Sequence, residues 1–239
     1  MPYLFIFDLH NTLVKDNDLV VVNAMNLVLS NHKKNVRVDI EYVRNYQAVL
    51  KPFAQYFRSI LPDASDHEIE EIMLATKELC EKFLIKQYIK RMDGAEKVLE
   101  EIKKNRDVIY VLSFSTTPSM DIYLRVTGLS RYVDKMLGIE NIQEIDRNHD
   151  PAVVKAGLLE EHMKVDKTSY EKIFMIGDSV HDMKAGRVVG AINIYFTNTS
   201  EVLDIADYAI DNLEDIIKIA YSKRASTSQI LATLKDKEP

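Results

Sequence analysis

The sequence contains one cysteine, no tryptophan and only seven glycines in 239 residues. Because Cys80 has no second cysteine to pair with, an intrachain disulfide is excluded, and a reducing compartment is favoured. No apolar run approaches the roughly 20 residues of a transmembrane helix. The N-terminus also lacks the basic and apolar regions that mark a signal peptide. We therefore expect a soluble, cytoplasmic protein.

An excess of charge of one sign is also missing. The formal net charge is −6, and acidic and basic residues are spread along the whole chain. This pattern argues against nucleic acid or an anionic membrane surface as a partner. Hydrophobic residues make up 46% of the chain, which is enough for a substantial core. The length suits one α/β domain that carries a smaller insertion.

Short apolar strands that alternate with helices predict a parallel sheet. The first strand, Leu4–Phe7, is continuously apolar, as is typical of a strand buried on both faces. Further strands are predicted at Val108–Leu112, Met136–Ile139, Lys172–Ile176, Ile192–Phe196 and Tyr208–Ile210, with helices at Ala95–Lys104, Ser119–Thr127, Pro151–His162 and Asn212–Lys223. Right-handed crossovers between such strands give a Rossmann-like, three-layer α/β/α core.

A long insertion follows the first strand and shows helical periodicity only. No segment between the first strand and Met92 predicts a strand, and Ser65 with Glu68 forms the capping-box pattern at the start of one of the inserted helices. We expect these helices to cover the carboxyl edge of the sheet like a lid. The predicted organisation is a core of residues 1–15 and 93–222, a helical cap of residues 16–92 and a C-terminal tail of residues 223–239.

Three aspartates follow predicted strands of the core. Asp8 ends the first strand, and Asp178 comes directly after the strand that ends at Ile176 and the glycine that follows it. Asp182 lies four residues further on, so both carboxylates face one side of a helix that starts near Ser179. Alone, each would fit a turn or a helix cap. Because parallel strands end at one edge of the sheet, we expect the three to converge there, where a hard cation such as Mg²⁺ would compensate their repulsion.

These residues resemble the signature of the haloacid dehalogenase-like hydrolase superfamily, in its phosphatase branch with a helical cap of the first type. The stretch Phe5–Thr12 resembles the first motif of that family, Asp-x-Asp-x-Thr, and Ser115 resembles the second. Gly177-Asp178-Ser179, with Asp182 and two later glycines, resembles the fourth. The insertion lies where the family's cap lies, and the resemblance covers residues 3–210.

The resemblance implies a mechanism of phosphate-ester hydrolysis. Asp8 would attack phosphorus and form an aspartyl-phosphate, which water then hydrolyses. Mg²⁺ would be bound by Asp8, Asp178 and the backbone carbonyl of His10, while Asp182 would orient a water on the metal. The metal would hold the nucleophile and the phosphoryl oxygens together.

The resemblance also implies donors for the phosphoryl oxygens. Thr12, Ser115 and the backbone N–H of Leu9 or Thr116 would donate these hydrogen bonds. Ser113 is the rival of Ser115 in the second-motif role. We prefer Ser115, because it stands just past the apolar run of the strand.

His10 departs from the family pattern. Phosphatases of the family usually carry a second Asp at this position, which protonates the leaving group and later activates water. An imidazole can perform both proton transfers near neutral pH. The alternative is that His10 marks a slow or inactive relative. Branches of the family that cleave carbon–halogen or carbon–phosphorus bonds also carry other residues here.

The third motif of the family needs a Lys, or sometimes an Arg, that binds the nucleophile and the phosphate. Its place is shortly before the helix that begins at Pro151, where the common Lys-Pro-x-Pro is absent. Arg147 fits the spacing best, and its guanidinium fork could hold phosphate through two hydrogen bonds. Lys155 is the reserve candidate, although the helix could turn it outward.

Taken together, the sequence predicts a Mg²⁺-dependent phosphomonoesterase that acts on a small phosphorylated metabolite, such as a sugar phosphate or a phosphoglycolate-like compound. A monomer or homodimer is expected. The enzymatic alternative is a dehalogenase or phosphonatase of the same family, and the pair Asp178 and Asp182 argues against a metal-free dehalogenase. The non-enzymatic alternative is a weakly active relative that binds a phosphorylated ligand or a partner protein.

Overall fold

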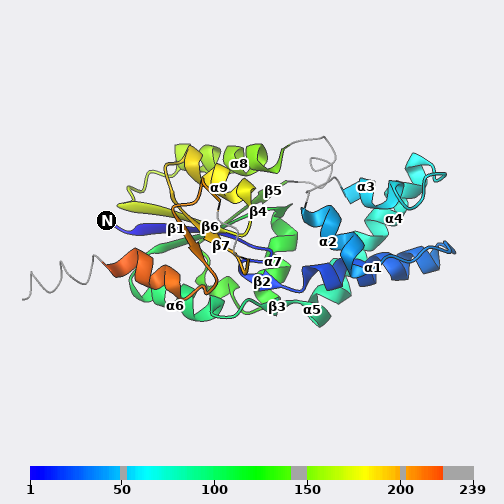
Figure 1. The fold of residues 1–239 in the computed structure, drawn as a ribbon, viewed down its shortest axis with the longest axis horizontal. Coiled ribbons are helices and arrows are strands. Elements are labelled where there is room, and N and C mark those ends of the chain that lie inside the picture. The colour runs from blue at the N-terminus through cyan, green and yellow to red at the C-terminus, as the bar shows by residue number, and fades with distance from the viewer. Residues whose placement is uncertain (49–52, 141–149, 200–202, 223–239) are drawn as a thin grey trace, which may run out of the picture.

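The core is built on one parallel sheet. The computed structural model describes residues 1–48, 53–140, 150–199 and 203–222. Six strands form the sheet in the order β5–β4–β1–β6–β7–β8 (Figure 1). Their bounds are Tyr3–Asp8 (β1), Val108–Thr116 (β4), Lys135–Ile139 (β5), Lys172–Gly177 (β6), Ile192–Phe196 (β7) and Tyr208–Ile210 (β8). The predicted Rossmann-like α/β fold is confirmed.

Strand β1 lies at the centre of this sheet. It pairs in parallel with β4 on one side and with β6 on the other, so that Asp8 lies beside Leu112 and Phe7 lies beside Ile176. The chain continues from β1 towards β4 and β5 and only later crosses to β6 on the opposite side. Ligands of open α/β sheets bind at the carboxyl ends of strands where the strand order reverses in this way. Asp8 occupies that position.

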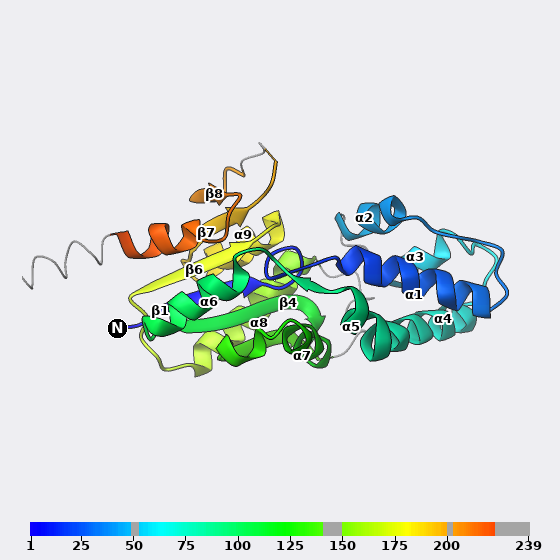
Figure 2. The same ribbon diagram turned by 90° about the horizontal axis from the view of Figure 1, so that it is seen from below.

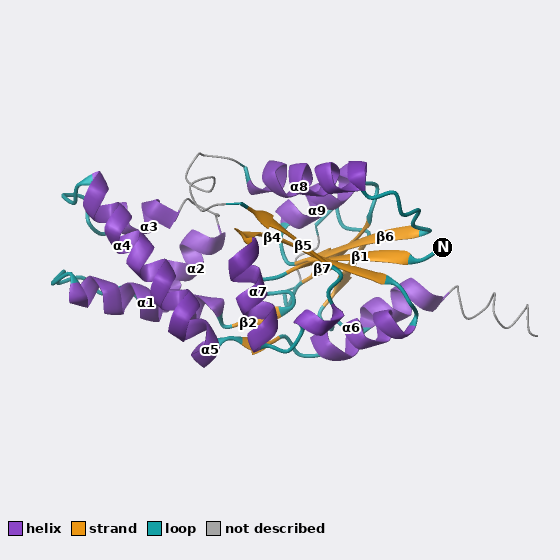
Figure 3. Ribbon diagram, turned by 180° about the vertical axis from the view of Figure 1, so that it is seen from behind, coloured by secondary structure: helices purple, strands orange, loops and turns teal. Residues whose placement is uncertain are grey.

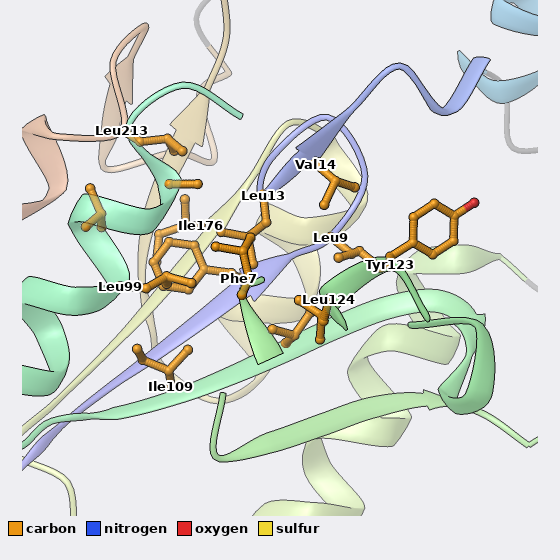
Figure 4. Close-up of a cluster of buried hydrophobic side chains, with 14 of the residues drawn as sticks. Phe7, Leu9, Leu13, Val14, Leu99, Ile109, Tyr123, Leu124, Ile176 and Leu213 are labelled. Atoms are coloured by element: carbon orange, nitrogen blue, oxygen red, sulfur yellow. The ribbon is translucent and has the colours of Figure 1, made fainter. Parts of the chain in front are cut away.

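Helices cover both faces of the sheet (Figure 3). On one face, Phe5 and Phe7 pack with Leu99 and Leu124 in a fully buried cluster, part of which is drawn in Figure 4. On the other face, Leu4 and Ile6 pack against the helices that follow β5 and β6. The first face carries α6 (Ala95–Lys104), α7 (Thr117–Val126), the 3₁₀ turn Ser130–Tyr132 and a helix over residues 215–222, and the second carries α8 (Pro151–Val165) and α9 (Val180–Val188).

The inserted helices form a separate body at one end of the molecule (Figure 2). They are α1 (Asn17–Asn31), α2 (Ile40–Ala48), α3 (Phe53–Arg58), α4 (Asp66–Leu79), a π-helix (Cys80–Leu84) and α5 (Ile85–Tyr88). Many of their apolar side chains, including Met25 and Phe57, build a cluster of their own, whereas Val20, Leu84 and Ile85 pack in the first cluster of the core. The predicted N-cap residue of α4 is Ser65, whose Oγ accepts a hydrogen bond from the Glu68 amide at 3.2 Å. None of the described helices combines the length and apolar character that crossing a membrane requires.

A short ribbon connects the cap to the core. Strand β2 (Val14–Lys15) pairs antiparallel with β3 (Lys90–Arg91), and Lys15 Nζ lies 2.9 Å from Asp93 Oδ1. The expectation that no strand lies between the first strand and Met92 is therefore wrong at β2 and at β3. Strands of two residues leave no alternation that a sequence pattern could reveal, and both residues of β3 are exposed. The predicted tail of residues 223–239 lies outside the described residues.

Candidate active site

Three carboxylates meet at the carboxyl edge of the sheet, as the sequence predicts. Asp8 ends β1, Asp178 follows the last residue of β6, and Asp182 lies in the first turn of α9. One oxygen from each lies within 4.8 Å of the others. Asp8 is 4% exposed and Asp182 is fully buried, whereas Asp178 is half-buried, so the cluster is accessible on the side of Asp178.

The turn between β6 and α9 explains how Asp182 reaches this position. Ser179 caps α9, and both its amide at 3.1 Å and its hydroxyl at 2.6 Å donate to Asp182 Oδ2. A Cβ atom on Gly177 would lie 2.4 Å from Asp182 Cγ, so only glycine allows this close approach. Asp182 is therefore both the partner of Ser179 in the capping box of α9 and a member of the cluster.

Lys155 bridges the cluster from α8. Its Nζ donates to Asp8 Oδ1 at 2.7 Å and to Asp182 Oδ1 at 2.6 Å, and the residue is 5% exposed. Lys155, the reserve candidate for the third-motif role, therefore points into the site, and α8 does not turn it outward. Pro151, Lys155 and Leu159 recur every four residues along the buried face of α8. Arg147, the preferred candidate, lies outside the described residues.

The charge of the site is unbalanced. Three carboxylates face one ammonium, which leaves two negative charges when all four groups are ionised. Burial and then the neighbouring Asp182 raise the pKa of Asp178 to about 6. Burial also raises the pKa of Asp8, although Lys155 opposes the change. Burial by itself would lower the pKa of Lys155, but Asp182 and Asp8 together raise it, so the lysine stays protonated.

This donor set fits a divalent cation. Carboxylate oxygens within 4.8 Å of one another are hard ligands of the kind that Mg²⁺ prefers. One divalent cation would also balance the two charges that Lys155 leaves uncompensated. Asp182 Oδ1 and Oδ2 already accept hydrogen bonds from Lys155 and Ser179, which leaves Asp8 and Asp178 as the better placed ligands.

His10 lies on the other side of Asp8, between a hydroxyl and an aromatic ring. Its Nε2 is 3.1 Å from Ser115 Oγ, and the Tyr123 ring packs edge-on against the imidazole at 4.7 Å between centroids. Burial, followed by the charge of Lys155, lowers the pKa of His10 to about 4, so the imidazole is neutral at ordinary pH. The structure thus brings Ser115 to the acid/base candidate, while its rival Ser113 is buried two residues earlier in the strand.

The sequence predicts phosphate contacts from the Thr12 hydroxyl and from the Thr116 backbone N–H, and the hydroxyls of the two threonines differ in their partners. Thr12 is fully buried, and its hydroxyl has no hydrogen-bond partner in the part of the chain that the structure describes. Thr116 instead caps α7, where its Oγ1 accepts from the Ser119 amide at 3.4 Å. The Thr12 hydroxyl is therefore the one that is free to donate to a ligand.

Several contacts of the site escaped the sequence analysis. The Asn11 side chain hydrogen-bonds Asp178 and lowers the pKa of that carboxyl against the effect of burial. The hydroxyl of Ser119 donates to Glu81 of the cap, and Tyr123 contacts both His10 and the cap. The sequence shows only that Asn11 lies three residues after Asp8. The contacts themselves join elements that are far apart along the chain, so no local pattern indicates them.

The fold and the site define a hydrolase of the phosphatase type, with a carboxylate cluster and a bridging lysine at the edge of a Rossmann-like sheet. The chain belongs to the haloacid dehalogenase-like hydrolase family, whose sequence model matches residues 4–190. The matched range begins in β1 and extends past α9, so it contains every residue of the cluster and the whole cap.

Two relatives with similar sequences are named for a pyrophosphatase. One, a PpaX-type pyrophosphatase of Caldanaerobacter subterraneus, is 23% identical over 223 residues, which are 90% of this chain and 92% of the relative. The other, pyrophosphatase PpaX of Halalkalibacterium halodurans, is 23% identical over 190 residues, or 77% of this chain and 79% of the relative.

Solved structures share the fold. A phosphatase structure from Clostridium difficile superposes with a TM-score of 0.73 at 18% identity and covers 92% of this chain and 99% of its own. The hydrolase YfnB of Bacillus subtilis, solved with magnesium, reaches 0.69 at 14% identity over 91% of this chain and 98% of its own. CbbY of Rhodobacter sphaeroides, solved with phosphate, reaches 0.67 at 17% identity over 89% and 95% of the two chains.

Proposed function

We propose that the protein is a Mg²⁺-dependent phosphomonoesterase that acts on a small phosphorylated metabolite in the cytoplasm through an aspartyl-phosphate on Asp8. The observation that carries the proposal is the arrangement around this carboxylate. Lys155 holds one Asp8 oxygen at 2.7 Å, Asp178 and Asp182 lie beside it, and the buried Thr12 hydroxyl has no hydrogen-bond partner among the described residues.

In the first step, Asp8 supplies the nucleophilic oxygen. Its free carboxylate oxygen forms a bond to phosphorus while the bond from phosphorus to the ester oxygen breaks. Lys155 orients the carboxylate by holding Oδ1, and its charge also offsets negative charge on the transferring group. Thr12, Ser115 and Arg147 are the further phosphate contacts that we propose. A Mg²⁺ ion bound by Asp8, Asp178 and the His10 carbonyl would supply additional charge compensation.

His10 handles the protons of both steps. A dianionic phosphate beside the imidazole raises its pKa, which favours the protonated form that gives its proton to the leaving oxygen. The neutral imidazole then accepts a proton from the water that attacks phosphorus and releases phosphate from Asp8. The proton from water leaves His10 protonated, and the buried setting that lowers the pKa of His10 to about 4 favours release of this proton to solvent once phosphate has left.

The test is hydrolysis with and without Mg²⁺. The purified protein is incubated with p-nitrophenyl phosphate, sugar and nucleoside phosphates, phosphoglycolate and pyrophosphate, the last because two relatives are named for that activity. We expect Mg²⁺-dependent phosphate release that Asp8→Asn abolishes. Asp121→Asn is the matched control, since Asp121 forms a surface pair with Arg125. No turnover of any of these substrates, with Asp8→Asn equal to the parent protein, would refute the proposal.

A further inference from the structure

Helix α7 connects the cap to His10 through one buried tyrosine. Tyr123 is 7% exposed, and its ring meets the His10 imidazole at 84°, which is the edge-to-face geometry that aromatic pairs favour. Figure 4 shows this ring at the rim of the apolar cluster, with its hydroxyl directed away from the other side chains. One face of Tyr123 therefore belongs to the core, while its polar end is available to another element.

That polar end contacts the cap. The Tyr123 hydroxyl donates to Asn17 Oδ1 at 2.6 Å, and Asn17 is the first residue of α1. One turn earlier on α7, the Ser119 hydroxyl donates to Glu81 in the π-helix of the cap. Helix α7 thus holds the cap at its first helix and again at the π-helix, shortly before the chain returns to the core.

The same helix restricts the imidazole. Ser115 holds His10 Nε2 at 3.1 Å, but a single hydrogen bond leaves the ring free to tilt about that contact. The edge of Tyr123 packs against the imidazole and removes this freedom. We propose that Tyr123 is a positioning residue that couples the seating of the cap to the orientation of the His10 imidazole. The inference rests on the proposed function, in which His10 transfers protons.

The coupling has a simple physical origin. If α1 moves away, the Tyr123 hydroxyl loses its acceptor Asn17 and with it the contact that fixes the orientation of the ring, so the ring is free to shift. A shifted ring no longer fixes the imidazole. Proton transfer to the leaving group is then efficient only when the cap is seated over the site, which prevents the acid from acting on an open, wet site.

The experiment compares two variants on two substrates. Tyr123→Phe keeps the ring but loses the hydrogen bond to the cap, and Asn17→Ala removes the acceptor. Tyr110→Phe is the matched control, because Tyr110 is 6% exposed and its hydroxyl donates to Asp166 at 2.7 Å, outside the site. The substrates are an alkyl monophosphate, whose leaving group needs a proton, and p-nitrophenyl phosphate, whose leaving group departs without one.

We expect kcat/KM for the alkyl phosphate to fall about two- to tenfold in Tyr123→Phe and in Asn17→Ala, the factor that one hydrogen bond corresponds to. The value for p-nitrophenyl phosphate stays close to that of the parent. In the double variant, kcat/KM for the alkyl phosphate falls no further than in either single variant, because the two substitutions remove the same interaction. In Tyr110→Phe, kcat/KM is unchanged for both substrates.

Three outcomes overturn the inference alone. The first is an equal fall of kcat/KM for both substrates in Tyr123→Phe, which indicates a structural role only, and the second is no fall of kcat/KM for the alkyl phosphate. Additive effects in the double variant also contradict it, since they place the two residues in separate interactions. If the parent protein turns over neither these two substrates nor any substrate of the panel above, and Asp8→Asn equals the parent, the proposed function itself is refuted, and the inference with it.

Discussion

Replacement of Lys155 by methionine tests the electrostatic account of the site most directly. Methionine keeps much of the side-chain volume but removes the two charge-assisted hydrogen bonds to Asp8 and Asp182, at 2.7 and 2.6 Å. Each such bond contributes about 1.5–3 kcal/mol. Removing one partner of a buried ion pair typically costs about 3–5 kcal/mol, because the remaining charge is left uncompensated.

We therefore expect Lys155→Met to lower the free energy of unfolding by about 3–5 kcal/mol in the presence of a chelator. For a protein of this size, that change lowers the melting temperature by about 6–20 °C. Lys103→Met is the control, since Lys103 also pairs with a carboxylate, Asp134 at 2.7 Å, but its side chain is 33% exposed. A surface pair of that kind contributes no more than about 1 kcal/mol.

Magnesium separates this electrostatic explanation from a packing defect. Without Lys155, the three ionised carboxylates carry one more uncompensated charge, so Mg²⁺ should raise the stability of Lys155→Met more than that of the parent protein. Urea unfolding with EDTA and with saturating Mg²⁺ measures both quantities. A loss no larger than that of Lys103→Met, or an equal effect of Mg²⁺ on parent and variant, would show that the reasoning is wrong. Hydrolysis should fall about 10²–10³-fold in Lys155→Met even with Mg²⁺ present.

Three further predictions follow from the same geometry. Gly177→Ala places a Cβ 2.4 Å from Asp182 Cγ, so it should destabilise the protein by about 1–3 kcal/mol and lower kcat. Gly157→Ala is the control in the same unfolding and activity assays, because a Cβ at that position meets no atom within 4 Å and should be neutral or stabilising. Thr12→Val removes a buried hydroxyl without a described partner, so kcat/KM for phosphate esters should fall while the urea midpoint stays equal or rises; a lower midpoint would contradict the assignment of this hydroxyl to substrate. Burial holds the folded-state pKa of Asp178 at about 6, above its ordinary value, so the metal-free protein should lose stability as pH rises from about 4 through 6. The stabilisation by Mg²⁺ should grow over the same interval, and thermal melts with and without Mg²⁺ across this range check both signs.

The carboxylate cluster could be predicted from the sequence because its physical basis is mostly local. A continuous apolar strand followed by Asp8, and another followed by Asp178, place two carboxylates at one edge of any parallel sheet. The four-residue spacing to Asp182 needs only the geometry of the first helical turn. These rules hold whatever surrounds the strands, and the structure confirms the convergence of the three side chains.

The direction of the Lys155 side chain could not be predicted from the sequence, because it depends on the rotation of α8. Apolar residues lie all round this helix, and Val153 is 65% exposed, so the sequence pattern did not mark the buried face. The buried row through Pro151, Lys155 and Leu159 becomes evident only when α8 is packed on the sheet and against α9. Arg147 remains a prediction.

By itself, the sequence determined the Rossmann-like core, the inserted helices of the cap and the three acidic positions, since strand and helix periods and the edge rule of parallel sheets act over short distances. Only the tertiary structure decided that Lys155 reaches Asp8, that Ser115 and Tyr123 enclose His10, and that Asn17 of the cap holds Tyr123. Such contacts join residues up to 147 positions apart in the chain. Their geometry is set by the packing of whole elements, which no local pattern encodes.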